Sequence, residues 1–286
     1  MFRATRALAL RRLAPIAFLA AIVVANLAPA TVAAVVDPVA LTAAETEMVD
    51  LLNTDRTAVG LVPVRVDSRL MAIARARSND MVAKNYFSHT QPDGKNVFDI
   101  LTAQAITWYT AGEIIAYNGY PIDVTAEGAN SQWMNSPGHK AIIVSTSMNY
   151  VGVGLAVDEA TGKKVWTAVY IKGPDRTGAK ASIAAPTIAT GSGLTRLVTV
   201  SWSGADVPLQ VLTSGFHSFQ VQRRTDGGTW TTVYSSTTLK SMGLSLPGGH
   251  TYEFRVAARD KAGNWGAWVN TSVRFRSTLG IIRIIR

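Results

Sequence analysis

The chain has 286 residues, no cysteine and a formal net charge of +9. This length predicts two domains. The lack of cysteine excludes a disulfide-based scaffold, so each domain has to be stabilised by burial of apolar surface, which a domain of about 100–150 residues can supply.

The positive charge is unevenly distributed. Between Val35 and Ala184, thirteen Lys/Arg stand against fifteen Asp/Glu (net −2), whereas from Ala185 onward eleven stand against four (net +7). Two interpretations of the basic C-terminal part remain open: charge that keeps the protein soluble, or attraction to anionic envelope polymers or lipid surfaces. No aromatic–basic RNA motif or helix-turn-helix pattern is present, so we expect no nucleic-acid partner.

Residues 1–34 are predicted to be a signal peptide. Four arginines precede the apolar stretch Leu13–Leu27. The small residues after this stretch suit cleavage by a signal peptidase after Ala30 or Ala34. The stretch is short for a membrane-spanning helix, which needs about 20 apolar residues. We therefore expect a secreted, extracellular protein without a transmembrane segment in its mature chain, and an uncleaved anchor is the alternative.

Four helices are expected in the first domain. Thr42-Ala43-Ala44-Glu45 is a capping box that predicts a helix to about residue 57. Asp67 is predicted to cap a second helix, in which apolar residues recur at helical spacing. A third helix is expected over residues 96–104, and Thr125 is expected to cap a fourth that carries Trp133.

A β-hairpin is expected to follow these helices. Residues 151–157 alternate valine or leucine with glycine or alanine, and residues 165–171 return after a turn. Helices before and after short strands, without regular βα alternation, indicate an α+β sandwich. The pair Gly152 and Gly154 lies inside a strand and lacks a third glycine, which excludes a dinucleotide-binding loop.

Three motifs each bring one side chain that can bind metal. They are Phe87-Ser88-His89 with Gln91-Pro92-Asp93-Gly94, then Ala111-Gly112-Glu113, then Trp133-Met134-Asn135-Ser136-Pro137-Gly138-His139. Each side chain is expected on a short turn, and the intervals are too long for one helix face, so only the fold can bring the three together. In this order the motifs resemble the CAP (SCP-like) superfamily of secreted proteins, in its short bacterial form, from about Thr42 to Ile171. The resemblance implies an α-β-α sandwich.

The resemblance implies that His89, Glu113 and His139 line one cleft. Two imidazoles and a carboxylate are typical of a catalytic-type zinc site, so we predict that the three bind a divalent metal, Zn²⁺ being the candidate, or a small ligand. A polar network that ties the three motifs together is the alternative. The chain departs from the family in having no glutamate after Trp133, and in having Ile114 where the family usually has asparagine. We expect the second change to reshape the edge of the cleft.

No catalytic residue is predicted with a defined role. The chain has no His-Glu-x-x-His helix, Gly-x-Ser-x-Gly elbow or P-loop. The family has no single agreed activity, so the resemblance does not decide the function. We favour a binding role, and the alternatives are a zinc-dependent extracellular hydrolase of peptides or esters and a structural adhesin with an inert cleft.

The second domain is expected to be an all-β sandwich. The sequence divides into a first domain at 35–178, a linker rich in small residues at 179–193, the second domain at 194–277 and a tail at 278–286. Short strand candidates separated by turn signals predict the sandwich. They are Leu197–Trp202, Phe216–Arg223, Thr229–Tyr234, Met242–Leu246, Tyr252–Ala258 and Val269–Phe275.

The details of this domain resemble a fibronectin type III module. Trp202 lies in an early strand, Tyr252-x-Phe-x-Val-x-Ala follows a Pro-Gly-Gly turn, and Asp260-Lys-Ala-Gly-Asn-Trp265-Gly precedes the last strand. The resemblance implies that the Tyr252 hydroxyl bonds to the backbone as a tyrosine corner. We expect this basic module to hold the protein near anionic cell-envelope polymers, with His217 and His250 at its surface.

Overall fold

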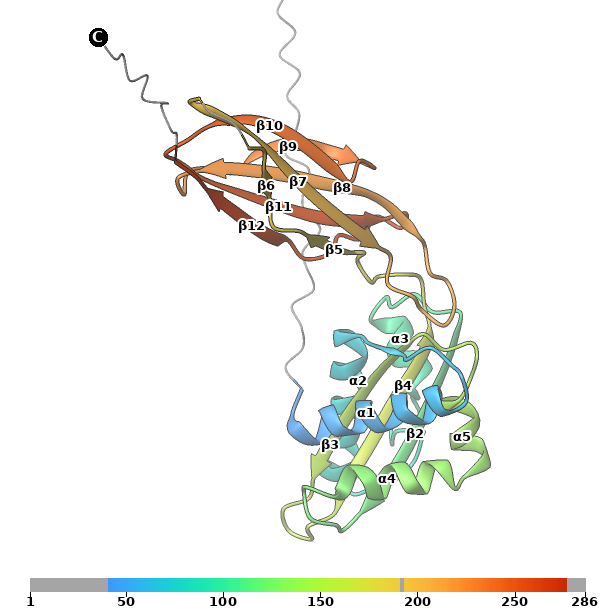
Figure 1. The fold of residues 1–286 in the computed structure, drawn as a ribbon. Coiled ribbons are helices and arrows are strands. Elements are labelled where there is room, and N and C mark those ends of the chain that lie inside the picture. The colour runs from blue at the N-terminus through green and yellow to red at the C-terminus, as the bar shows by residue number, and fades with distance from the viewer. Residues whose placement is uncertain (1–40, 191–192, 277–286) are drawn as a thin grey trace, which may run out of the picture. The chain divides into compact units, whose positions relative to one another are not determined.

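The computed structural model describes residues 41–190 and 193–276. The predicted signal peptide (1–34) and tail (278–286) lie outside the described residues. The described part begins with a region of helices and strands and continues with a region made of strands (Figure 1). Within these ranges no helix has the length and apolar character needed to cross a membrane.

The first region has helices on both sides of a four-stranded sheet. Its helices are α1 (Ala43–Ala58), α2 (Ser68–Ala83), α3 (Val97–Ala103), α4 (Thr125–Met134) and α5 (Pro137–Ile143). Its strands are β1 (Arg65–Val66), β2 (Thr110–Asn118), β3 (Tyr150–Val157) and β4 (Lys164–Lys172). The strand order is β1-β3-β4-β2; β1 runs parallel to β3, and the other pairs are antiparallel.

Side-chain alternation along β4 builds the three layers. Trp166 and Tyr170 belong to the core that α1 and α4 cover, whereas Val169 and Ile171 belong to the core that α2 and α3 cover. Because successive strand residues point to opposite faces, one strand supplies both cores. The predicted α-β-α arrangement is therefore present, and the predicted hairpin is confirmed as β3 and β4.

Local sequence signals start the first helices as predicted. The Thr42 amide donates to Glu45 Oε2 at 2.9 Å, and the Glu45 amide donates to Thr42 Oγ1 at 3.2 Å, which completes the capping box. Asp67 caps α2 by accepting the Arg69 amide at 2.9 Å. Helix α3 also begins at its expected position, after the N-cap Asn96.

Thr125 does not cap α4, so that prediction is wrong. It is the first residue of the helix, and the N-cap Val124 makes no side-chain cap. The buried Thr125 hydroxyl instead donates to Asn118 Oδ1 at 2.7 Å and accepts from Trp166 Nε1 at 3.0 Å. The hydroxyl thus satisfies two polar groups inside the core, where an unpaired group is costly.

Two glycines of β3 allow α2 to lie directly on the sheet. A Cβ added at Gly154 would come within 2.2 Å of the Arg75 amide nitrogen, and one added at Gly152 would meet the backbone of Leu70 and Met71. A strand glycine at such a place marks the close approach of another backbone. This approach brings the inward face of α2 to the sheet that carries Glu113.

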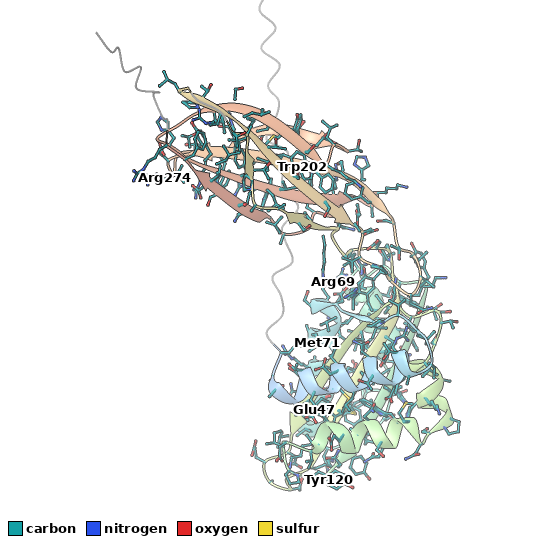
Figure 2. All side chains as sticks on the ribbon, viewed as in Figure 1. Glu47, Arg69, Met71, Tyr120, Trp202 and Arg274 are labelled. Carbon is teal, nitrogen blue, oxygen red and sulfur yellow. The ribbon has the colours of Figure 1, made fainter. Side chains whose placement is uncertain are left out.

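The second region consists of two sheets. Its strands are β5 (Lys180–Ile183), β6 (Thr187–Ile188), β7 (Thr195–Ala205), β8 (Phe216–Thr225), β9 (Thr231–Thr237), β10 (Ser241–Pro247), β11 (Thr251–Asp260) and β12 (Val269–Arg274). One sheet has the order β10-β7-β5, with β6 also on β7, and the other has the order β12-β11-β8-β9. Trp202, labelled in Figure 2, packs edge to face on Phe219 in the core between them.

Two expectations for this region have opposite outcomes. The Tyr252 hydroxyl donates to the carbonyl of Pro247 at 2.8 Å, so the predicted bond to the backbone is confirmed. The segment 179–193 was expected to be a linker without strands, but it supplies β5 and β6, and this expectation needs correction. Their short sequences carry little strand signal because pairing with β7, which lies later in the chain, holds them in place.

Candidate functional site

Glu113 lies inside strand β2 rather than on a turn, which corrects the expectation from its motif. Residues 114–116 are buried, and β2 pairs with β4 along its whole length. Alternation sends Ile114 into the core beneath α1 and α4, and Glu113 and Ile115 to the opposite face, toward α2. Ile114 therefore does not shape the cleft edge; it fills the core behind the site.

Arg77 of α2 holds Glu113 in a buried ion pair. Arg77 Nε donates to Glu113 Oε1 at 2.8 Å and Nη2 to Oε2 at 3.4 Å, and the two side chains are 1% and 2% exposed. Burial alone would lower the pKa of Arg77, but the hydrogen bond and charge of Glu113 outweigh it and raise the pKa above its ordinary value.

Arg77 also fixes the segment that carries His89. Its guanidinium donates to the Tyr86 hydroxyl at 2.7 Å and to the carbonyls of Ser88 at 2.8 Å and His89 at 3.2 Å. Arg77 lies outside the three sequence motifs that predict the site. A signal was present, since Arg77 follows Ile73 by four positions and precedes Met81 by four, which places it on the buried stripe of the helix.

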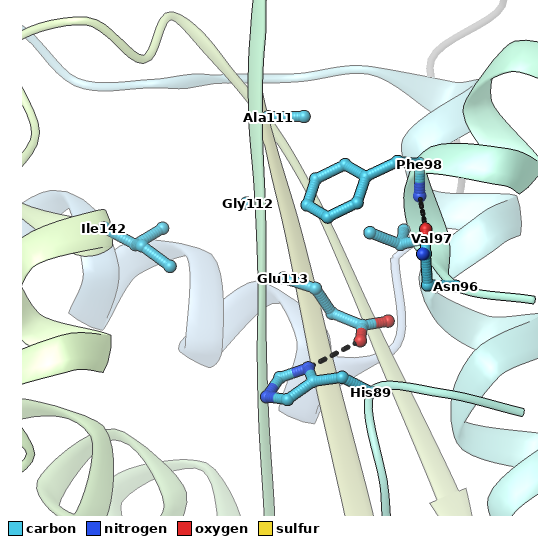
Figure 3. A pocket seen from close by; sticks show the side chains of 8 residues that line it. All are labelled: His89, Asn96, Val97, Phe98, Ala111, Gly112, Glu113 and Ile142. Carbon is cyan, nitrogen blue, oxygen red and sulfur yellow. Dashed lines mark hydrogen bonds and ion pairs between the residues drawn. The ribbon is translucent and has the colours of Figure 1, made fainter.

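His89 meets Glu113 directly. Its Nδ1 lies 2.8 Å from Glu113 Oε2, and the His89 side chain is 52% exposed (Figure 3). A carboxylate on one ring nitrogen orients the imidazole and favours the tautomer with the proton at Nδ1. Nε2 is then the nitrogen of His89 that remains to bind an outside group.

His139 lies in the first turn of α5 rather than on a turn before a helix, which corrects the third expectation. Pro137 is the first residue of this helix, a position that suits its fixed φ and missing amide hydrogen. Burial, and to a smaller extent the charge of His89, lowers the pKa of the half-buried His139.

A small pocket opens beside His89 and Glu113. It has a volume of about 250 Å³. Its remaining lining residues are Asn96, Val97, Phe98, Ala111, Gly112 and Ile142. Figure 3 shows Phe98 and Ile142 on either side of β2, with Glu113 and His89 at one end. The pocket is therefore an apolar slot with a polar end, and His139 does not line it.

The structure does not gather the three side chains into one ligand set. Within the described ranges, the donor atoms of His89, Glu113 and His139 do not all come within 4.8 Å of one another. Both oxygens of Glu113 are engaged by Arg77 and His89. The candidate ligands for a divalent metal are therefore the imidazoles of His89 and His139, and Glu113 lies behind His89 as the group that orients its ring.

Comparison with known proteins places the first region in a family. Residues 49–170 match the sequence profile of the CAP, Cysteine-rich secretory protein family. The chain is 36% identical over 134 residues to the uncharacterized protein YkwD of Bacillus subtilis, covering 47% of this chain and 49% of that protein. It is 31% identical over 131 residues to the uncharacterized membrane protein YlbC of the same species, covering 46% and 35%. The chain thus spans half or less of these relatives' lengths.

Solved structures give weaker likenesses. An extracellular protein containing a SCP domain from Bacillus anthracis has 28% identity and a TM-score of 0.40, with 45% of this chain and 40% of that chain covered. An outer surface protein from Borrelia burgdorferi has 16% identity and a TM-score of 0.40, with 46% and 92% covered. These scores are too low to add to the family match. By the profile and the bacterial relatives, residues 49–170 form a CAP (SCP-like) domain.

Proposed function

We propose that this is a secreted binding protein whose CAP cleft takes a divalent metal ion, Zn²⁺ being the candidate, or a small ligand. His89 and His139 are the binding residues, and Glu113 orients His89. We propose further that the basic second region, a module of fibronectin type III type, holds the protein at an anionic cell envelope.

The observation that carries the cleft proposal is the chain of contacts from Arg77 to Glu113 to His89. A buried ion pair such as Arg77–Glu113 is costly to assemble. Its carboxylate contacts the half-exposed imidazole of His89, which lies beside a pocket. Such support is typical of a ring that binds a ligand through its other nitrogen. A bound zinc ion would supply a Lewis acid with open coordination positions.

The envelope proposal rests on charge. The chain from Ala185 onward carries a net charge of +7, whereas the preceding part from Val35 carries −2. A basic surface attracts polyanions at long range and is screened by salt. The Tyr252 hydroxyl bonded to Pro247 supports the fibronectin type III assignment, since this corner is a feature of such sandwiches.

A zinc titration tests the cleft. Zinc is expected to raise the melting temperature of the wild-type protein and not that of the double variant His89→Ala, His139→Ala, because only ligand binding to the folded state stabilises it. The variant His217→Ala, His250→Ala is the matched control, since both of its histidines are exposed in the other region. Equal shifts in the cleft variant and the wild type would show that the cleft is not the binding place.

A further inference from the structure

An alternating stack of arginine and tryptophan lies on one face of the second region. The Arg255 guanidinium carbon is 4.3 Å from the Trp230 ring centroid and 4.5 Å from that of Trp268. The Arg224 guanidinium carbon is 4.6 Å from the Trp230 centroid. Two indoles therefore hold the planar group of Arg255 between them, and the second guanidinium extends the stack.

The strand register places further arginines on the same face. Residues directly opposite in β8, β11 and β12 share a face, and this pairs Arg255 with Gln222, Glu253 with Arg224, and Thr251 with Arg274. Arg259 joins them, four residues after Arg255. We call these four arginines the arginine face. Along these three strands Glu253 is the one acidic residue on this face, so its net charge is +3.

Arg255 has no acidic partner within the described part of the chain. Both oxygens of Glu253 accept from Arg224, each at 2.7 Å. Arg255 donates through Nε to Gln222 Oε1 at 2.8 Å, and neither of its Nη groups has a hydrogen-bond partner among the described residues. Burial, and to a smaller extent the charge of Arg224, lowers the pKa of Arg255.

The two indoles and Gln222 hold the Arg255 guanidinium in place and leave both of its Nη groups to an outside partner. The two Nη groups of Arg255 form a fork in a fixed plane, which matches the two oxygens of a carboxylate or phosphate. The ligand therefore carries such a group.

The side chains around the stack restrict the chemical class of the ligand further. Gln222, Asn270 and Ser272 surround the stack on the same face and offer hydrogen bonds that suit sugar hydroxyls. Trp230 already stacks on two guanidinium groups, so it does not offer a free ring face to a nucleobase. The large apolar side chains at this site, Trp230 and Trp268, are partly buried and stack on guanidinium groups.

We propose that the arginine face binds an anionic polysaccharide, whose carboxylate or phosphodiester groups are held by the fork of Arg255 and whose sugars contact the surrounding amides and hydroxyls. The inference rests on the proposed function, since it names the site through which the basic region would hold an envelope polymer. Arg274, labelled in Figure 2, extends the positive charge toward the end of β12.

The experiment measures binding of the full-length protein to four polymers by isothermal titration calorimetry. Polygalacturonate carries carboxylates, poly(glycerol phosphate) carries phosphodiesters, pullulan is neutral, and single-stranded DNA carries phosphodiesters together with bases. The variants are Arg255→Gln, which removes the charge and fork, Arg255→Lys, which keeps only the charge, and Arg274→Gln, which leaves the stack intact. Lys240→Gln is the control, because it removes one exposed charge from outside the arginine face.

We expect binding to at least one anionic polymer and not to pullulan, with at least a tenfold loss in Arg255→Gln and Arg255→Lys. Arg274→Gln should lose about threefold, and Lys240→Gln less than twofold. Melting curves verify that each variant is folded, and if Arg255→Gln unfolds, Arg274→Gln against Lys240→Gln decides. If the wild type binds a polyanion and the arginine-face variants bind it equally well, the arginine face is not the binding site, although the envelope proposal stands. No binding of the wild type to either polyanion would overturn both, and tighter binding to single-stranded DNA would overturn the polysaccharide.

Discussion

Glu113 depends on a single residue that its own motif does not contain. The carboxylate is 2% exposed, and its charge is compensated by Arg77, 36 positions earlier in the chain. A buried carboxylate that loses its counter-charge is strongly destabilising. Arg77 therefore supplies the counter-charge of Glu113 and fixes the place of the His89 segment.

Replacement of Arg77 by methionine should show this dependence. We expect Arg77→Met to lower the free energy of unfolding by about 3–5 kcal/mol, because Glu113 is left buried and unpaired. The double variant Arg77→Met, Glu113→Leu should recover part of the loss, since the unpaired charge is gone. Urea denaturation followed by tryptophan fluorescence measures both, and a loss below about 1 kcal/mol in the single variant would contradict the account.

A second acidic residue near the site makes stability depend on pH. Burial would raise the pKa of Asp80, but hydrogen bonds from Lys84, Tyr86 and Gln91 lower it from 3.8 to about 2. The unfolded chain then binds more protons than the folded protein between these values. The stability that Asp80 contributes is fully present above about pH 4 and is lost as the pH falls toward 2.

The variant Asp80→Asn tests this dependence. We expect its free energy of unfolding to be lower than that of the wild type at pH 6, and the difference to shrink as the pH falls from about 4 to 2. Urea denaturation at pH 6, 4 and 2.5 gives the comparison. A difference that stays constant over these three pH values would exclude Asp80 as the titrating group.

At the scale of single residues, the sequence motifs predicted His89 and Glu113 but not Arg77, the residue that holds both in place. His89 and Glu113 were singled out from their motifs, and the structure brings them into contact. Helical periodicity places Arg77 on the buried face of α2 but does not say which residue of another element it will meet. Contacts across 36 positions follow from packing and not from local pattern.

At the scale of elements, local signals predicted the helices better than the strands. Capping residues mark the starts of α1, α2 and α3 in the sequence itself. Strand β2 was missed because Ile114, Ile115 and Ala116 are all buried, so its sequence lacks the alternation of a half-exposed strand. The position of α2 on the sheet is set by the glycines of β3, which leave no room for a side chain.

The variant Gly154→Ala tests that packing. The added methyl group would overlap the backbone of Ala74 and Arg75, and backbone cannot move aside as a flexible side chain can. We expect a loss of about 3 kcal/mol or more in the free energy of unfolding. Gly119→Ala is the control, because a Cβ there has no neighbour within 4 Å, and it should cost less than about 1 kcal/mol. A loss below about 1 kcal/mol in Gly154→Ala would show that β3 tolerates the change.

At the scale of the whole molecule, a region of helices and strands is followed by a region of strands. Composition and charge change near residue 185, and the two largest cores divide at nearly the same place, whereas Leu209 joins the core that α2 and α3 cover. The core of the second region is built from residues between Ala179 and Phe275, and the core between α1, α4 and the sheet from residues between Leu41 and Tyr170. The exact boundary was not predictable, because β5 and β6 belong to the second region through pairing alone.

Separate cores predict separate unfolding transitions. Regions with their own cores commonly unfold as independent units, so we expect two transitions in differential scanning calorimetry. Tyr252→Phe removes the bond to the Pro247 carbonyl and should lower one transition, by about 5 °C for a loss of about 1 kcal/mol. Gly154→Ala should lower the other and leave the first within about 1 °C. A single transition, or two transitions that each variant lowers equally, would contradict this expectation. The two regions would then unfold as one cooperative unit.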